Sequence, residues 1–73
     1  MDLNAKTIIE KLRNSKFPRT DTTEILKQIK NAKLDFKMTN KLADDLIQEI
    51  KQESKNVKLK ETIFQIAEIL DSD

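Results

Sequence analysis

The sequence contains no glycine at any of its 73 positions, and this absence restricts the folds that the chain can adopt. Two-residue β-hairpin turns need positive φ angles, which glycine supplies without steric cost. A sheet of several antiparallel strands is therefore not expected. The P-loop, the GxGxxG turn of dinucleotide-binding proteins and the EF-hand calcium loop all require glycine as well, so the chain lacks these motifs.

Cysteine and histidine are also absent, which removes whole classes of chemistry. The chain cannot form a disulfide framework, a thiolate nucleophile, a Cys/His zinc site or a Ser-His-Asp triad. Carboxylates, lysines and hydroxyls remain, but they show no arrangement typical of a catalytic site. We therefore expect no enzymatic activity, no cofactor and no bound metal ion.

Apolar residues recur at intervals of three and four in four segments, which is the pattern of a helix with one buried face. The pattern predicts helices at about residues 3–14, 21–33, 40–53 and 58–70. The expected core residues are Ala5, Ile8, Ile9 and Leu12, then Ile25, Ile29 and Ala32, then Leu42, Ala43, Leu46, Ile47 and Ile50, and finally Leu59, Ile63, Ile66, Ala67 and Leu70. Short connections between amphipathic helices predict an all-α fold, either a small four-helix bundle or an orthogonal helical array, in a single domain.

Polar residues next to these segments are expected to cap the helices. Asp2 or Asn4 fits the start of the first helix, and Asp21, with Glu24 three residues later, has the spacing of a capping box for the second. Thr39 fits the start of the third helix. The Phe17-Pro18 pair is expected to separate the first two helices, because a residue before proline disfavours the α conformation.

Residues 34–38 alternate between apolar and polar, which is the period of a β-strand. No partner strand is evident, so this segment is interpreted as an extended connector that places Leu34, Phe36 and Met38 in the core. The alternative is that the second helix continues to Lys37.

The charges are distributed unevenly along the chain. The net charge is only +1, but residues 1–41 hold ten basic and five acidic residues, whereas residues 42–73 hold four and eight. A candidate basic patch consists of Arg19, Lys27, Lys30, Lys33 and Lys37, with the four lysines expected on one stripe of the second helix. A candidate acidic patch on the third helix consists of Asp45, Glu49 and Glu53. The alternative is that both stripes are solvated faces that lie near each other across the bundle.

The last helix is apolar over much of its circumference. Phe64 and Ile69 fall on either side of its core stripe and form a candidate apolar interface, which Leu26 and Met38 could extend. Such an interface would fit a partner groove or a homodimer face. The alternative is that neighbouring helices cover this helix on three sides.

The segment from Phe17 to Asp21 opens the second helix and offers backbone N–H groups that could receive an anion. Arg19 and Lys16 would assist. The alternative is an ordinary helix start, in which the capping side chains satisfy these donors.

The order of the helices is similar to that of the ATP-cone, a small nucleotide-binding regulatory module. Residues 24–32, Glu-Ile-Leu-Lys-Gln-Ile-Lys-Asn-Ala, resemble its first helix, and residues 57–70 resemble its last. The resemblance implies a nucleotide-binding regulatory role. It assigns no binding residue, because the family's basic-Asp-Gly hairpin has no counterpart. The nearest stretch, residues 11–16, lacks the glycine.

These observations favour a non-enzymatic protein-interaction or regulatory module, such as an adaptor or inhibitor, that acts through charged stripes and an apolar patch. The alternative is a domain that binds a phosphate ligand, such as a nucleotide, or a nucleic acid through its basic half. The near-zero net charge and the lack of Tyr and Trp disfavour nucleic acid. The chain has no apolar run long enough to span a membrane, so we expect a cytoplasmic protein that does not bind membranes.

Overall fold

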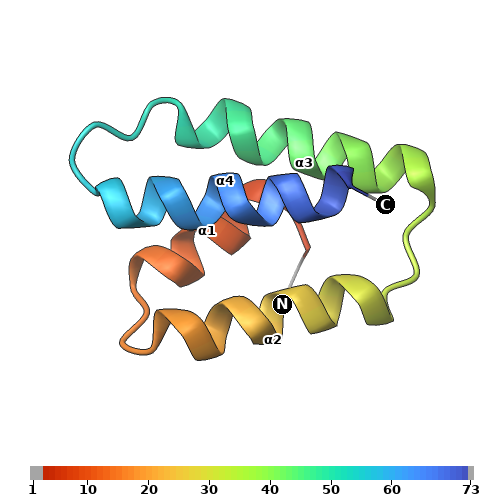
Figure 1. Cartoon of the computed structure of the whole chain (residues 1–73), viewed down its shortest axis with the longest axis horizontal. Helices are drawn as coiled ribbons and strands as arrows, with labels where there is room; N and C mark the ends of the chain where they lie inside the picture. Colours follow the sequence, from red (N-terminus) through yellow and green to blue (C-terminus); the bar gives the residue numbers. More distant parts are fainter. Residues whose placement is uncertain (1–2, 73) are drawn as a thin grey trace.

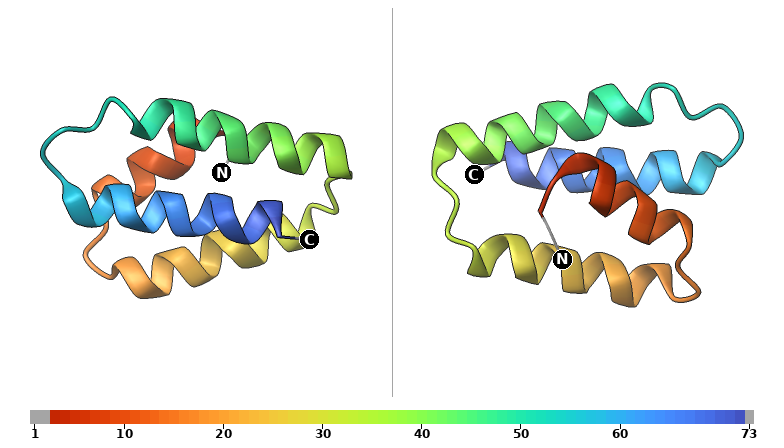
Figure 2. Two further views of the ribbon diagram at one scale, coloured as in Figure 1. Left: turned by 45° about the horizontal axis from the view of Figure 1, so that its top comes forward. Right: turned by 180° about the vertical axis from the view of Figure 1, so that it is seen from behind.

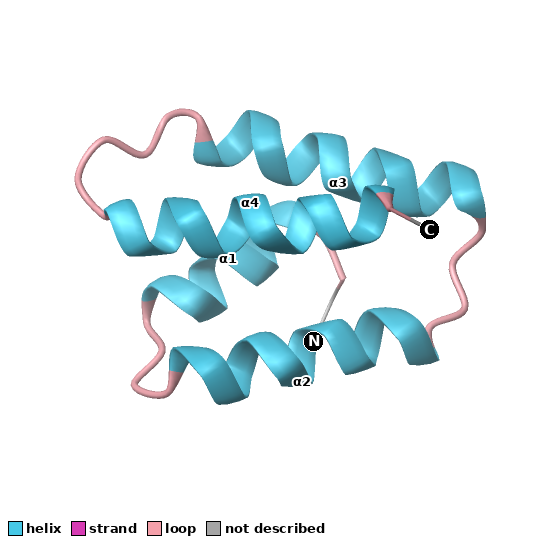
Figure 3. Ribbon diagram, in the orientation of Figure 1, coloured by secondary structure: helices cyan, strands magenta, loops and turns pink. Residues whose placement is uncertain are grey.

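The computed structural model describes residues 3–72, which fold into four α-helices joined by short connectors (Figures 1 and 3). Helix α1 spans Ala5–Arg13, α2 spans Pro18–Asn31, α3 spans Phe36–Ile50 and α4 spans Val57–Asp71. The described part of the chain contains no β-strand. The prediction of a small all-α helical bundle is therefore confirmed. Over residues 3–72, no helix is both long enough and apolar enough to cross a membrane.

The helices pack unequally against one another. Helices α3 and α4 are antiparallel neighbours and form the most extensive pair, while α1 lies obliquely behind them and contacts every other helix (Figures 1 and 2). Helix α2 runs in the same direction as α4 and packs against α1 and α4, but not against α3. The side of α2 that points away from α1 and α4 is therefore not covered by another helix of the described chain.

The core is built from the apolar stripes of all the helices. Its members are Ala5, Ile8, Ile9, Leu12, Ile25, Ile29, Leu42, Ala43, Leu46, Ile50, Leu59, Ile63, Ile66, Ala67 and Leu70. All but two of the core residues expected on the four predicted helices are in this set. Ile47 is only partly buried, and Ala32 is exposed. Helix α2 contributes only Ile25 and Ile29, so it is the helix with the least buried apolar surface.

Helix α2 begins at Pro18, three residues earlier than the sequence pattern indicated. Proline is well suited to the first helical position, because an N–H group there would have no intrahelical acceptor. Asp21 consequently lies inside the first turn and does not cap the helix. Its carboxylate accepts a hydrogen bond from the Ser15 hydroxyl in the preceding connector.

The expectation of an extended connector over residues 34–38 was wrong, because α3 begins at Phe36. Asp35, rather than Thr39, caps this helix, and its Oδ1 accepts a hydrogen bond from the Met38 N–H at 2.8 Å. Only Leu34 packs partly against the core. Phe36 and Met38 are 70% and 54% exposed.

The alternative of a second helix that continues to Lys37 was also wrong. Helix α2 ends at Asn31, and Lys33 has a φ angle of 52°. A left-handed residue directly after a helix reverses the chain, and glycine usually fills this position. A lysine stands there in this glycine-free sequence.

Candidate functional site

A groove runs along the surface between α2 and α4. One hollow of about 400 Å³ is lined by residues from the first half of α2 and by Thr62 and Gln65 of α4. A second hollow of about 520 Å³ shares Pro18, Arg19, Thr62 and Gln65 with the first, and it continues toward the end of α1 and the start of α4. The shared residues make the two hollows one continuous depression.

The α2 wall of this groove follows from helical spacing. Arg19 and Thr23 line the first hollow. Leu26 and Lys30 follow them at intervals of three and four residues, so all four side chains lie within about 60° of one another around the helix axis. Leu26 is partly buried against the core, whereas Lys30 is exposed.

The α4 wall repeats the same intervals. Lys58, Thr62 and Gln65 line the hollows, and Ile69 lies one turn beyond Gln65 on the same side of the helix. Ile69 is 48% exposed. Helices α2 and α4 run in the same direction (Figure 1), so both series of side chains extend from the hollows toward the C-terminal ends of their helices. We name this surface the α2–α4 groove. Its hollows are lined by Arg19, Thr23, Lys58, Thr62 and Gln65, and Leu26, Lys30 and Ile69 continue the same helix faces beyond the hollows.

The α2–α4 groove is positively charged. Arg19, Lys30 and Lys58 are exposed, and none of them forms an ion pair within residues 3–72. Glu61 is the one acidic side chain among the described residues that line the two hollows. The groove therefore has exposed cations along its hollows, and the partly exposed Leu26 and Ile69 lie on the same helix faces beyond them.

The start of α2 differs from the expected capped entrance. Phe17 occupies the N-cap position, and no side chain caps the helix there. The Thr22 hydroxyl donates to the Pro18 carbonyl at 2.6 Å, and the Thr23 hydroxyl donates to the Arg19 carbonyl at 3.0 Å. These threonines satisfy carbonyl groups inside the helix and not the N–H groups of its first turn.

The residues of the candidate basic patch are divided among three elements. Lys27 and Lys30 lie on α2, Lys33 lies in the connector, and Lys37 lies in the first turn of α3, not on the second helix. All four lysines are exposed and unpaired in the described chain. Arg19 is about 16 Å from Lys30 along the α2 axis. It therefore belongs to the opposite end of the groove, not to the lysine cluster.

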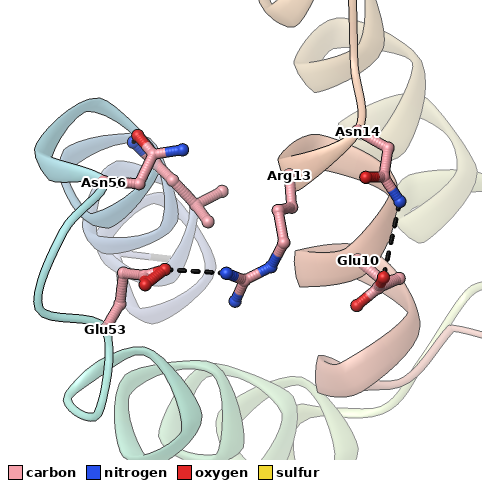
Figure 4. A network of polar contacts seen from close by, with 6 residues as sticks. Glu10, Arg13, Asn14, Glu53 and Asn56 are labelled. Atoms are coloured by element: carbon pink, nitrogen blue, oxygen red, sulfur yellow. Dashed lines mark hydrogen bonds and ion pairs between the residues drawn. The ribbon is translucent and has the colours of Figure 1, made fainter.

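The residues of the candidate acidic patch do not form one free stripe. Asp45 pairs with Lys41 of its own helix at 3.0 Å. Glu53 lies beyond the end of α3 and pairs with Arg13 of α1 at 2.8 Å (Figure 4). Glu49 is exposed beside Lys6 in a shallow hollow between α1 and α3. Within residues 3–72, no group of three acidic side chains could hold a metal ion together.

The two residues of the candidate apolar interface lie on different sides of α4. Phe64 is 38% exposed and Ile69 is 48% exposed, but five residues of separation place them about 140° apart around the helix. Ile69 belongs to the α2–α4 groove, where Leu26 accompanies it. Phe64 does not share that face.

Sequence reasoning missed Thr23, Lys58, Thr62 and Gln65. The signal available for finding them was the repeated interval of four, three and four residues in both helices, directly beside each core stripe. The repeated interval does not indicate that the series on α2 and the series on α4 lie next to each other in the fold.

Comparison with protein-family models, curated proteins and solved structures finds no match to this chain. The resemblance to the ATP-cone therefore has no support from these comparisons. Lys11 and Arg13, in the stretch nearest to that family's hairpin, lie in the last turns of α1.

Proposed function

We propose that the protein is a non-enzymatic interaction module that binds a partner protein in the α2–α4 groove and acts as an adaptor or inhibitor. The observation that supports this proposal is the pair of hollows that Arg19 and Lys58 line, together with Leu26, Lys30 and Ile69 on the same helix faces beyond them. Within residues 3–72, none of the three cations forms an ion pair. Apolar side chains left at a protein surface are favourable to bury against a partner. Cations around them guide the encounter and select a partner of opposite charge.

The lysines at the end of α2 strengthen this proposal. Lys27 and Lys33 extend the positive charge beyond Lys30. Lys33 adopts a left-handed conformation, which costs a residue with a Cβ atom about 1–2 kcal/mol. This conformation belongs to the exit from α2, and what Lys33 adds to the surface is its exposed charge.

The experiment is affinity capture of partners with matched charge variants. The groove variant is R19E/K30E, and the control variant is K51E/K55E, which makes the same change in net charge at exposed lysines of the α3–α4 connector. We expect the control variant to capture a specific protein partner in the same amount as the unmodified protein. The groove variant should capture at least tenfold less of that partner. Circular dichroism and thermal unfolding of both variants would show that the fold is retained.

Two results would contradict the proposal. Equal capture by the groove and control variants would show that the groove is not the binding surface. Capture that disappears after nuclease treatment would show that the partner is a nucleic acid and not a protein.

A further inference from the structure

We infer that the α2–α4 groove binds an acidic amphipathic helix of the partner protein. This inference rests on the proposed function and adds the chemistry of the bound segment. It follows from three features of the groove, which are the position of its cations, the hydrogen bonds of its threonines, and its length.

The cations lie around an apolar centre. Arg19 and Lys30 mark the two ends of the α2 wall, about 16 Å apart along the helix axis. Leu26 lies between them in the sequence and is partly buried against the core. Ile69 is 48% exposed and lies on the same side of α4 as Gln65. A complementary helix would place apolar side chains at intervals of three and four residues over this centre, with Asp or Glu toward each end.

The threonines of the groove favour a helix over an extended peptide. The hydroxyl groups of Thr22, Thr23 and Thr62 all donate to carbonyl oxygens of their own helices, at 2.6, 3.0 and 2.9 Å. These three hydroxyl groups are therefore already engaged, and the side-chain donors left in the groove belong to Arg19, Lys58 and Gln65. Charged donors of this kind suit carboxylates better than the regularly spaced N–H and C=O groups of an extended segment, which would each need a partner. A helix satisfies its own backbone and needs only complementary side chains.

The groove has too few cations to match the phosphate charges of a nucleic acid of the same length. Duplex DNA carries about one negative charge per 1.7 Å of its axis, so a 16 Å segment presents roughly nine charges. The groove offers only Arg19, Lys30 and Lys58 over this length, and Glu61 lies at the end near Lys58. A short protein helix with two to four carboxylates matches the groove better.

The test is an NMR titration of the ¹⁵N-labelled protein with three probes. The first is a 16-residue helical peptide with Leu at three- and four-residue intervals and Glu on the flanks. The second has the same composition in a scrambled order that destroys the apolar face. The third is a single-stranded 16-nucleotide DNA. We expect the helical peptide to shift amide signals along α2 and α4, and to bind at least tenfold more tightly than either other probe.

Variants locate the binding site and test each part of the groove. K30E and I69S should each weaken binding of the helical peptide at least fivefold, whereas K51E/K55E should change it less than twofold. Tighter binding of the DNA, or equal binding of the two peptides, would overturn the inference. Concentration-dependent shifts along α2 and α4 without any probe, together with a dimer in sedimentation equilibrium, would identify a second copy of this chain as the occupant and would also overturn it.

The two failures can be told apart. If the helical peptide does not bind but R19E/K30E still abolishes protein capture, the groove binds a partner of different chemistry and only this inference is wrong. If R19E/K30E changes neither measurement, the proposed function is wrong as well.

Discussion

Arg13 and Glu53 lie 40 positions apart in the sequence and form an ion pair in which Arg13 Nη1 donates to Glu53 Oε1 at 2.8 Å (Figure 4). The pair joins the last residue of α1 to the connector between α3 and α4. The Glu53 side chain is only 13% exposed, whereas that of Arg13 is 45% exposed. This partial burial distinguishes the pair from Lys41–Asp45, whose side chains are 77% and 49% exposed.

The Arg13–Glu53 pair should contribute measurably to stability. A double-mutant cycle with R13Q and E53Q is expected to give a coupling free energy of about 0.5–1 kcal/mol in urea unfolding, because water screens this pair less than an exposed one. The same cycle on Lys41 and Asp45 serves as the control and should give no more than about 0.5 kcal/mol. An equal or smaller coupling for Arg13–Glu53 would contradict the prediction.

Replacing Lys33 by glycine should stabilise the protein. Lys33 has a φ angle of 52°, and glycine adopts this conformation without the steric cost of a Cβ atom. The greater freedom of glycine in the unfolded chain offsets part of the gain, so K33G should raise the free energy of unfolding by about 0.5–1 kcal/mol. K33A removes the same charge but keeps the Cβ atom, and it should bring no gain. A loss of stability in K33G would argue against the left-handed conformation.

The start of α3 can be tested through its cap. Removing the Asp35 side chain in D35A should cost about 1 kcal/mol, because the Met38 N–H loses its acceptor. Thr39 lies inside the helix, and its hydroxyl donates to the Asp35 carbonyl. T39A should therefore cost less than about 0.5 kcal/mol, since alanine has the higher helix propensity. The opposite order in thermal unfolding would favour a helix start at Thr39.

Two isoleucines of α4 should differ in their contribution to the core. Ile63 is fully buried, whereas Ile69 is 48% exposed. Truncation of Ile63 in I63V should cost about 0.5–1.5 kcal/mol, because it removes a buried methyl group and leaves a small cavity. I69V should change the free energy of unfolding by less than about 0.5 kcal/mol. Similar losses in chemical unfolding of the two variants would show that Ile69 is also buried.

The helical fold class and nearly all of the helical core residues follow from the amino-acid pattern alone. Leu59, Ile63 and Leu70 are buried as their spacing predicts, because burial on one helical face is a periodic property that a short segment already contains. The starts of α2 and α3 were less certain, because several polar residues near each start can act as a cap. At Phe36 the helix begins within an alternating segment, and the hydrogen bond from the Met38 N–H to Asp35 determines the start.

The packing of the helices, in contrast, determines which charged side chains lie together. Sequence spacing grouped Glu53 with Asp45, but the packing of α1 beside α3 places Glu53 against Arg13. Sequence spacing also grouped Arg19 with lysines that the structure divides among α2, the connector and α3, whereas the packing of α2 beside α4 places Arg19 across a groove from Gln65. The physical reason is that helical periodicity specifies which side of each helix faces the core, but not which neighbour lies beside that side.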